Sequence, residues 1–549
     1  MTYSFDIFDT CLVRKCGEPN CVFDLLAERA FIKPVPKDIK RSFVAARIAA
    51  GINSWTADQK LSDIYDSLGF EYPSLLQKQQ LITLEQDIER EILCPVQEIV
   101  NLIFSLRQKG HRIVFISDMY LGAEFIKPIL QKTGLLEPGD PVYVSCDVGM
   151  TKASGKLFSY IHEKEGIPYE SWHHYGDNKI SDIKIPQRFG IHTHKISHSY
   201  SPYQLRMKSV ATLNFRLGDF MAGLSRSIAL QGERSAHKDF VLDIIAPLFV
   251  SFVFRIMSDA REKGFKSLYF CARDAYPLYR IACQMREIFH EISINYLYIS
   301  RESLYKGNDA DKIGYFTQVG LASNSGDIAI VDMRSSGNTL RVLNDLLSRH
   351  NYAPVYGYFF EICSNKIEQR DGLSYSAELD ALYLQQMNNP AVRKLPSNWY
   401  LYELFFPLNS QKRTVGYVNN GQEFVPVFED RNNDDSALEN RQDYVEWRNW
   451  AFDTYTNYYI QLGLTTHSDD IFYHIAIPQL VDFFNSPNKH YLSPLAEFYG
   501  LSPDNEMLKY VDNSLIRLPL NIIKKRTLWK RGTIFYSLPG WVARLLYKK

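Results

Sequence analysis

Short apolar segments recur between helical patterns over the first 200 residues, and this order is the strongest constraint on the fold. The first segment, residues 3–8, is followed by a long helical stretch over about residues 20–100. Further strand segments lie at residues 112–117, 142–146 and 173–176, separated by helical patterns. Strands that alternate with helices form parallel sheets, because each helix carries the chain back to the same end of the sheet. We therefore expect an α/β fold, a Rossmann-like parallel sheet with a helical insertion after the first strand.

A second series of the same kind predicts a second α/β domain. Its strand segments are residues 267–272, 296–300, 328–332 and 355–362. The polar stretch 429–435 is the next boundary, and beyond it the chain is helical and rich in aromatic residues. A chain of 549 residues is long enough for two or three domains. We expect domains at residues 1–200, with a helical cap at about 18–100, at residues 235–430, and at residues 436–549.

Composition indicates a folded, soluble protein, with 46% hydrophobic and 23% charged residues. The eight cysteines include no Cys-x-x-Cys pair, so we expect reduced thiols in the cytoplasm, without disulfides or a zinc site. We expect no segment to span a membrane. The most apolar candidate, residues 241–257, carries polar residues or proline at every fourth position, which is typical of a mostly buried helix with one polar stripe.

Polar residues follow the strand ends of the first domain. Asp6 closes the first strand, Ser117 closes the strand at 112–117, and Lys152 precedes a helix; residues 175–182 contain two further aspartates. The carboxyl ends of parallel strands are where α/β sheets bind ligands. Phosphoryl transfer through an aspartyl-phosphate needs a carboxylate nucleophile, a hydroxyl and an ammonium for the phosphoryl oxygens, and further carboxylates for Mg²⁺.

The order and spacing of these segments resemble the haloacid dehalogenase superfamily over about residues 1–200. The resemblance implies that Asp6 is the nucleophile and that residues 20–100 form the cap. It implies that Ser117 and Lys152 hold the phosphate, with Lys156 on the same helix as the alternative to Lys152. It also implies a Mg²⁺ site, which we assign to Asp6, Phe8, Asp177 and Asp182.

One position departs from the phosphatases of this superfamily. They carry a second Asp, the general acid and base, two residues after the nucleophile, and this chain has Phe8 there. Asp9 is one residue further on, while Thr10 keeps the frame of the motif. The dehalogenase branch also lacks the second Asp. Phosphatase activity therefore requires Asp9 or another group to supply the proton.

A second group of candidate residues follows the strand at 328–332. The strand ends at Asp332, a loop of small residues follows, and an amphipathic helix continues from it. Small residues let backbone N–H groups converge on a phosphate, and a helix N-terminus favours an anion. Asp332 could accept hydrogen bonds from two sugar hydroxyls. A similar strand, loop and helix lie at residues 268–278, and an ordinary α/β domain is the alternative interpretation.

Taken as a pair, the two loops resemble the phosphoribosyltransferases over about residues 235–430. Asp332 matches the second acidic residue of their phosphoribosyl-pyrophosphate (PRPP) loop, and residues 336–339 match its Thr-Gly-x-Thr, although Val331 and Ser336 depart from the motif. Residues 273–277 then lie at the position of the pyrophosphate loop. The resemblance implies Asp332 as a catalytic residue, and PRPP contacts from Arg273, Asp274, Arg301, Ser335, Ser336, Gly337, Asn338 and Thr339.

The whole arrangement is similar to bacterial PRPP-dependent ribofuranosyltransferases of capsule and O-antigen assembly, some of which are joined to a dehalogenase-type phosphatase. The resemblance implies transfer of ribofuranosyl 5-phosphate from PRPP to a glycan acceptor, in a lipid-linked form, and removal of the 5-phosphate, with Mg²⁺ as cofactor. Two other functions stay open. One is a single phosphohydrolase whose second domain binds a phosphorylated ligand. The other is a non-catalytic scaffold, which Phe8 and Val331 favour.

The last 37 residues are strongly basic although the formal net charge of the chain is zero. Residues 513–549 hold nine Lys and Arg and no Asp or Glu, interleaved with Trp, Leu and Tyr. Three interpretations stay open: a docked terminal helix with a solvated basic face, a helix on an anionic membrane surface, and a nucleic-acid contact. We expect no nucleic-acid partner. We expect the protein in the cytoplasm, with a peripheral position at the inner face of the cytoplasmic membrane as the alternative.

Overall fold

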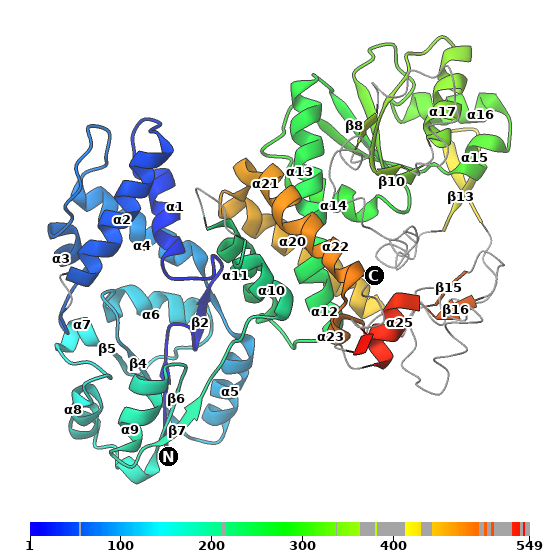
Figure 1. Cartoon of the computed structure of the whole chain (residues 1–549). Helices are drawn as coiled ribbons and strands as arrows, with labels where there is room; N and C mark the ends of the chain where they lie inside the picture. The colour runs from blue at the N-terminus through cyan, green and yellow to red at the C-terminus, as the bar shows by residue number, and fades with distance from the viewer. Residues whose placement is uncertain are drawn as a thin grey trace. The chain divides into compact units, whose positions relative to one another are not determined.

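The computed structural model forms two compact units (Figure 1). Unit 1 consists of Met1–Ser235 and Tyr458–Leu464, and unit 2 of Ala236–Asn457 and Thr465–Lys549. These units divide the chain differently from the predicted domains, whose boundaries stay predictions. The structure describes residues 1–53, 56–210, 216–335, 337–362, 379–381, 412–429, 442–492, 499–501, 507–509, 530–538 and 542–543.

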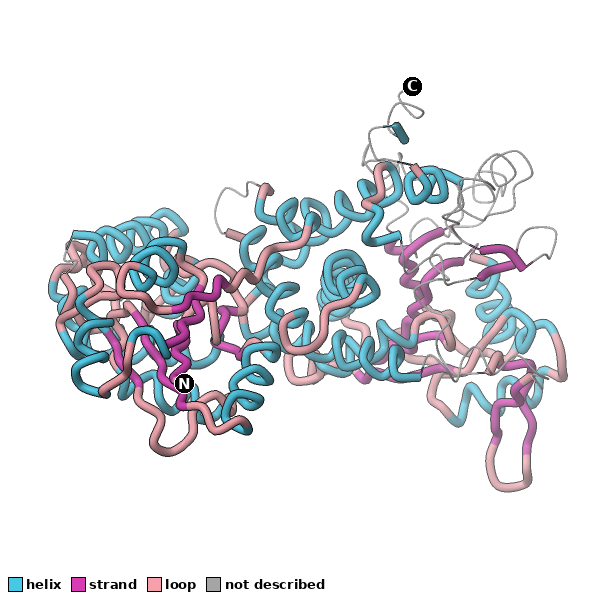
Figure 2. Tube along the Cα trace, turned by 90° about the horizontal axis from the view of Figure 1, so that it is seen from below, coloured by secondary structure: helices cyan, strands magenta, loops and turns pink. Residues whose placement is uncertain are grey.

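Unit 1 is built on a five-stranded parallel sheet in the order β5-β4-β1-β6-β7. Figure 2 shows these strands side by side with helices around them. The strands are β1 (Thr2–Asp6), β4 (Arg112–Ser117), β5 (Val142–Val144), β6 (Trp172–Gly176) and β7 (His192–Lys195). The α/β parallel fold predicted for this part of the chain is therefore confirmed.

Amphipathic segments pack on this sheet because their apolar residues recur at helical spacing. On one face, side chains of α8 join those of β4 and β6 in a core that includes Val114, Phe158 and Trp172. The helices and turns that connect the strands are α5 (Gln97–Gln108), α6 (Ala123–Lys132), α7 (Ser145–Val148), α8 (Lys156–Glu165), η1 (Tyr169–Ser171), η2 (Lys179–Lys184) and α9 (Ile185–Gln187). Two further helices, α10 (Pro202–Lys208) and α11 (Leu217–Ala229), follow the last strand, β7.

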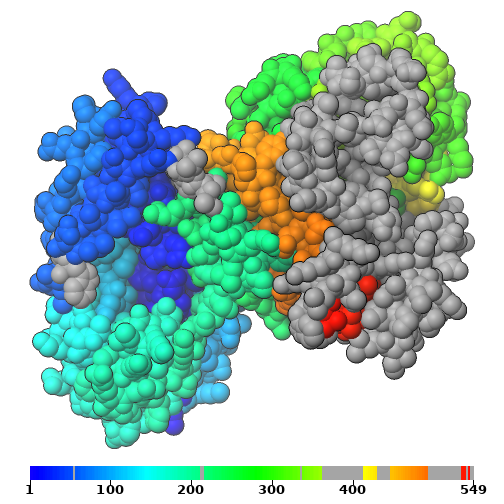
Figure 3. Space-filling view, in the orientation of Figure 1, coloured from blue at the N-terminus to red at the C-terminus, as the bar shows by residue number. Residues whose placement is uncertain are grey.

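The predicted helical insertion lies between two short antiparallel strands, β2 (Leu12–Arg14) and β3 (Leu93–Pro95). It forms a separate group of helices next to the sheet, drawn in blue beside the cyan atoms of the core in Figure 3. Two buried ion pairs, Arg14–Glu89 at 2.9 Å and Arg47–Glu85 at 2.6 Å, connect its elements. The helices are α1 (Cys21–Arg29), α2 (Lys37–Asn53), α3 (Leu61–Asp66) and α4 (Lys78–Ile92).

Unit 2 contains a second five-stranded parallel sheet, in the order β12-β11-β10-β8-β9. Its strands are β8 (Ser267–Cys271), β9 (Ser293–Leu297), β10 (Ile328–Ser335), β11 (Tyr356–Ile362) and β12 (Leu379–Ala381). The helices between them are α14 (Tyr276–Gln284), α15 (Arg301–Tyr305), α16 (Asp309–Gln318) and α17 (Asn338–Arg349). The prediction of a second α/β domain is confirmed.

The remaining described elements of unit 2 are mostly helical, in agreement with the expected helical C-terminal region. An antiparallel hairpin, β13 (Thr414–Asn419) and β14 (Phe424–Phe428), packs against α16. The other elements are α20 (Gln442–Gln461), whose last residues belong to unit 1, η8 (Leu464–His467), α21 (Ser468–Ile471), η9 (Phe472–Ala476), α22 (Ile477–Asn485), α23 (Lys489–Leu492), β15 (Tyr499–Leu501), β16 (Met507–Lys509) and α25 (Lys530–Ser537).

One described helical run, Ala236–Glu262, is long and apolar enough to cross a membrane by length and composition. It comprises α12 (Ala236–Phe240), η3 (Val241–Ile245) and α13 (Ala246–Glu262), and 94% of its most apolar window is buried. Its polar stripe has partners within unit 2: Asp243 accepts a hydrogen bond from the Tyr491 hydroxyl at 2.7 Å. This run is therefore a core helix, as its sequence pattern predicted.

The basic tail lies mostly outside the described residues. Within it, α25 buries Thr533, Ile534 and Phe535 and contacts α23. Burial of these three residues favours the docked-helix interpretation for this part of the tail. Membrane contact by the other residues of the tail stays a prediction.

Candidate active site

The centre of the sheet in unit 1 carries the candidate site at its carboxyl edge. Asp6 is the last residue of β1, which lies between β4 and β6. In the register of β1 and β4, Asp6 pairs with Ile116, so the buried Ser117 lies one residue further toward the same edge. The parallel register therefore places a carboxylate and a hydroxyl next to each other from two segments about 110 residues apart.

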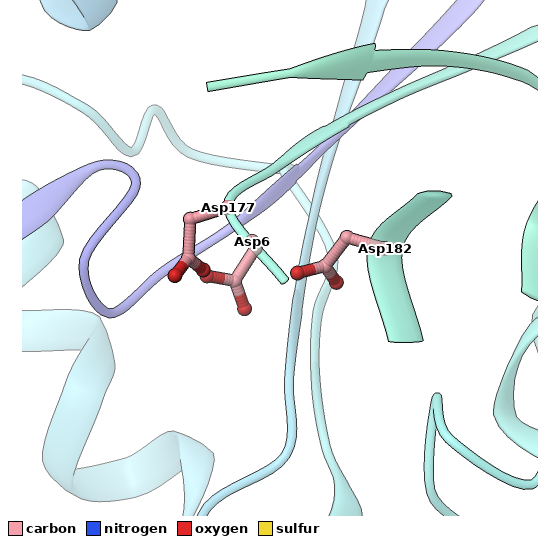
Figure 4. A group of neighbouring side chains, drawn as sticks. All are labelled: Asp6, Asp177 and Asp182. Atoms are coloured by element: carbon pink, nitrogen blue, oxygen red, sulfur yellow. The ribbon is translucent and has the colours of Figure 1, made fainter. Parts of the chain in front are cut away.

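Three aspartates converge at this edge, as Figure 4 shows. One oxygen each of Asp6, Asp177 and Asp182 lie within 4.8 Å of one another. Gly176 makes this approach possible, because a Cβ atom at that position would lie 2.5 Å from the Cβ and Cγ atoms of Asp182. The backbone N–H of Asn178 also donates to Asp182 at 2.9 Å and fixes its carboxylate.

Lys152 is the counter-charge of this cluster. Its buried ammonium donates to Asp182 at 2.6 Å and forms a second, shorter ion pair with Asp6. Burial, and then the charges of Asp182 and Asp177, raise the pKa of Asp6, while Lys152 opposes this rise. Although burial disfavours the charge of Lys152, its two carboxylate partners raise its pKa above the usual range. The predicted Lys152 is therefore held in the centre and charged, whereas the alternative Lys156 opens α8 as an exposed residue.

The donor set fits a magnesium ion. Mg²⁺ binds oxygen ligands at about 2.0–2.1 Å in an octahedron, which places neighbouring ligands about 3 Å and opposite ligands about 4 Å apart. Asp6, Asp177 and Asp182 offer oxygens within 4.8 Å, so small side-chain movements would bring them to these distances. Three carboxylates facing one ammonium also leave an excess of negative charge that a divalent cation would neutralise.

Sequence reasoning assigned no role to two residues that position this centre. The Asp118 carboxylate accepts the backbone N–H groups of Lys152 at 2.8 Å and Ala153 at 3.3 Å, so it fixes the loop that carries the lysine. His174 lies 3.2 Å from Asp182 through Nε2 and 2.7 Å from the Ser4 hydroxyl through Nδ1. The position of Asp118 directly after Ser117 could have indicated its role. No feature of the sequence pointed to His174.

Phe8 does not offer a side-chain ligand to the predicted metal site. Its ring lies 4.9 Å from the guanidinium carbon of Arg14, and a phenyl group has no donor atom, so only its backbone could reach an ion. Asp9 adopts a left-handed conformation with φ 58°, and its carboxylate is 3.9 Å from Arg226. After burial, Asp9 is the largest influence that raises the pKa of Asp177. Asp9 is therefore coupled electrostatically to Asp177.

The predicted PRPP residues gather at the carboxyl edge of the sheet in unit 2. The strand does not end at Asp332 as predicted, because β10 continues to Ser335, but Asp332 lies just beyond the last residue that pairs with the neighbouring strand β8. Asp274 follows β8, after a cis peptide between Ala272 and Arg273. Burial, and then Asp274, raise the pKa of Asp332 to about 7, while the N–H of Met333 and the charge of Arg301 oppose this rise. Burial also raises the pKa of Asp274, against Arg273 and Arg301. These four residues therefore share one electrostatic environment.

The small-residue loop is described in part. Gly337 has φ 76° directly before α17, a conformation that L-residues with a side chain rarely adopt, and Asn338 and Thr339 form the first turn of that helix. Ser300 caps α15 by accepting the N–H of Ser303 at 3.0 Å, which places Arg301 at the start of that helix. Ser335 ends β10, and the predicted contact from Ser336 lies outside the described residues.

The fold and site define a parallel α/β protein with an aspartate and lysine centre. No family model and no curated protein matches the chain. A HAD family enzyme from Bacteroides thetaiotaomicron is similar, with 14% identity over 37% of this chain and 97% of that chain (TM-score 0.29). The magnesium-bound HAD-hydrolase YfnB from Bacillus subtilis has 20% identity over 36% and 90% (TM-score 0.27). An L-2-haloacid dehalogenase has 16% identity over 36% and 84% (TM-score 0.27).

Proposed function

We propose that unit 1 is a magnesium-dependent phosphohydrolase of the haloacid dehalogenase type, with Asp6 as nucleophile. The observation that carries this proposal is the convergence of Asp6, Asp177 and Asp182 at the carboxyl edge of the sheet, where the Lys152 ammonium pairs with Asp6 and Asp182. Each group has a chemical task there. The carboxylate of Asp6 attacks, and the ammonium of Lys152 neutralises charge on the phosphoryl oxygens.

The proposed reaction has two steps. An Asp6 oxygen forms a bond to phosphorus while the bond to the leaving oxygen breaks, and Asp9 gives that oxygen a proton. Water then attacks the phosphorus of the aspartyl-phosphate, its proton passes to Asp9, and inorganic phosphate leaves with Asp6 restored. When bound, Mg²⁺ would be held by the three aspartates and would supply charge stabilisation to the phosphoryl group.

Phosphate release from p-nitrophenyl phosphate in the presence of Mg²⁺ tests this activity. Asp140→Asn is a matched control, because Asp140 pairs with Arg107 and precedes β5, at the opposite edge of the sheet from Asp6. The control should release phosphate at the wild-type rate. Release of halide from a 2-haloacid without phosphatase activity would assign unit 1 to dehalogenase chemistry instead.

For unit 2 we propose transfer of ribofuranosyl 5-phosphate from PRPP. The supporting observation is that Asp332, Asp274 and Arg301 interact electrostatically at the carboxyl edge of the second sheet. Gly337, which follows the same strand as Asp332, directly precedes the N-terminus of α17. Asp332 would hold the ribose hydroxyls, and the N–H groups before α17 would hold the 5-phosphate. The acceptor hydroxyl would form the new glycosidic bond as the bond to pyrophosphate breaks and its proton is lost.

The two proposed activities form a sequence. The transferase would leave a ribofuranose that carries a 5-phosphate, and unit 1 would remove that phosphate. The proposed acceptor is a lipid-linked glycan of capsule or O-antigen assembly. Acceptor-dependent release of pyrophosphate from PRPP with Mg²⁺ tests the transferase. If calorimetry detects no PRPP binding, the phosphohydrolase proposal stands without it.

A membrane role of the tail has its own test. Removal of residues 520–549 should reduce binding to vesicles that contain anionic phospholipid and leave turnover of soluble substrates nearly unchanged. Equal vesicle binding by both forms would exclude this role. Unfolding of unit 2 on truncation would instead support the docked helix, in line with the burial of α25.

A further inference from the structure

A row of histidine and tyrosine rings crosses one face of the sheet in unit 1. In the strand register, Tyr3 of β1 pairs with His173 of β6, which pairs with His192 of the edge strand β7. The rings of Tyr3 and His173 stack at 4.7 Å, and those of His173 and His192 at 4.9 Å. His194, two residues along β7, lies on the same face, because alternate residues of a strand point to the same side.

Two imidazole nitrogens in this row lie at a distance that suits one metal ion. His173 Nδ1 and His194 Nε2 are 3.1 Å apart. With bonds of about 2.0–2.1 Å, two nitrogens on one ion lie about 2.9 Å apart in square-planar geometry and about 3.4 Å apart in tetrahedral geometry. The observed separation falls between these values. The ring centroids lie 5.4 Å apart, so the two nitrogens face each other, and both side chains would turn slightly to direct their lone pairs at one ion in place of the hydrogen bond.

The same two rings are accessible, and their pKa values lie below the usual range. Both side chains are half-buried, and His192 beside them is exposed. Partial burial, and then the neighbouring His192 and His194, lower the pKa of His173. Partial burial and His192 likewise lower the pKa of His194. A metal binds the neutral imidazole, so these rings need not lose a proton at neutral pH before they ligate.

We propose that His173 and His194 form a binding site for a first-row transition-metal ion of the Zn²⁺ and Cu²⁺ class. Imidazole nitrogen suits these ions, whereas Mg²⁺ prefers oxygen, so the site would not compete for the Mg²⁺ of the acidic centre. Water would complete the coordination on the solvent side. The ion would join the edge strand β7 to β6, the strand that carries His174 and leads into Asp177.

Thermal unfolding and metal titration of the full chain test this site. The protein carries no histidine tag and is first saturated with Mg²⁺, so that the acidic centre is filled. We expect Zn²⁺ to raise the Tm of the wild type, because a ligand that binds only the folded state stabilises it. We expect His194→Gln and His173→Gln to weaken Zn²⁺ binding at least about tenfold, or about 1.4 kcal/mol.

His290→Ala is the matched control, because its side chain in unit 2 is 84% exposed and lies outside the ring row. This variant should bind Zn²⁺ as the wild type does. With Cu²⁺, electron paramagnetic resonance should show nitrogen hyperfine coupling that is reduced in each of the two glutamine variants. Zn²⁺ affinity that is unchanged in both glutamine variants would overturn the proposal. So would binding that is lost in Asp6→Asn and kept in His194→Gln.

Discussion

The charges of individual side chains determine the pKa values in the acidic centre. Asp6, Asp177 and Asp182 would repel one another in this volume without a cation, and Lys152 provides one with its side chain buried. Burial opposes the charge of Asp182, but the hydrogen bond from His174 and the charge of Lys152 lower its pKa below the usual range. The pKa of Asp6 is instead raised. Two carboxylates in the same cluster thus differ in proton affinity because their partners differ.

Phe8 stands at the position where a phosphatase of this type would carry its general acid, and this gives a prediction for Asp9. In Asp9→Asn the carboxyl group is lost, while Asn tolerates the left-handed backbone at this position. If Asp9 supplies the proton, kcat for p-nitrophenyl phosphate should fall about 100-fold or more, the usual contribution of a general acid. Mg²⁺ affinity, measured by calorimetry, should change little. A wild-type kcat in Asp9→Asn would mean that another group supplies the proton.

The pKa of Asp332 predicts a pH dependence of PRPP binding. Because burial and Asp274 raise this pKa to about 7, Asp332 is mostly neutral at about pH 6 and ionised at about pH 8. Ribose hydroxyls donate more strongly to the ionised form, so PRPP affinity should rise with pH across this window. In Asp332→Asn the affinity should be about tenfold to a hundredfold lower at pH 8, and its pH dependence should be weaker. A wild-type affinity that falls over this range would contradict the assignment.

At the scale of elements, the strands that lie between helical patterns could be predicted, whereas β2, β3 and β7 could not. β4 begins and ends at its predicted residues, and β8 and β10 begin at theirs. β7 has the sequence HTHK, without apolar alternation, and only pairing with β6 makes it a strand. β2 and β3 are short, and their pairing depends on the helical insertion that separates them.

The residues of the candidate site also divide into those that the sequence indicates and those that depend on strand pairing. The structure brings together Asp6, Lys152 and Asp182, which the sequence singled out, because each follows or precedes a recognisable strand or helix. His174 was missed because its role depends on which face of β6 it occupies, and that depends on the register with β1. The histidine row across β6 and β7 was missed for the same reason.

The turn after β6 gives a prediction that depends on backbone packing. A methyl group in Gly176→Ala would meet Asp182 at 2.5 Å, so the carboxylate must move. We expect Mg²⁺ affinity to fall at least about tenfold, and stability to fall by about 1–3 kcal/mol from overpacking. Calorimetry and chemical denaturation measure the two effects. In the control Gly69→Ala the new methyl group meets nothing within 4 Å, so both quantities should stay near wild type. Unchanged Mg²⁺ affinity in Gly176→Ala would argue against Asp182 as a ligand.

At the scale of the whole molecule, the chain contains two parallel sheets, each with its own candidate site at a carboxyl edge. In each unit an aspartate lies on a strand inside the sheet, Asp6 at the end of β1 and Asp332 within β10, and polar residues that follow neighbouring strands complete the site. Separate sheets predict separate activities. The proposed reaction sequence requires only that the product of unit 2 reach unit 1.

Separation of the two proposed activities can be measured with variants of the proposed PRPP loop. Gly337 has φ 76°, so Gly337→Val strains the backbone before α17, and its side chain would also stand where the 5-phosphate should bind. We expect PRPP binding to be lost and phosphate release from p-nitrophenyl phosphate to stay within about twofold of wild type, as for surface changes. Loss of both activities with the fold intact would contradict independent sites.

The central claim is that Asp6 becomes covalently phosphorylated, and acid-quench mass spectrometry tests it most directly. Wild-type protein is mixed with p-nitrophenyl phosphate and Mg²⁺, quenched in acid within the first turnovers, and digested. We expect a phosphoryl group on the peptide that contains Asp6, and its absence in Asp6→Asn, which keeps the shape of the side chain but loses the nucleophile. Steady phosphate release by Asp6→Asn at the wild-type rate, or a phosphoryl group on another residue, would contradict the account.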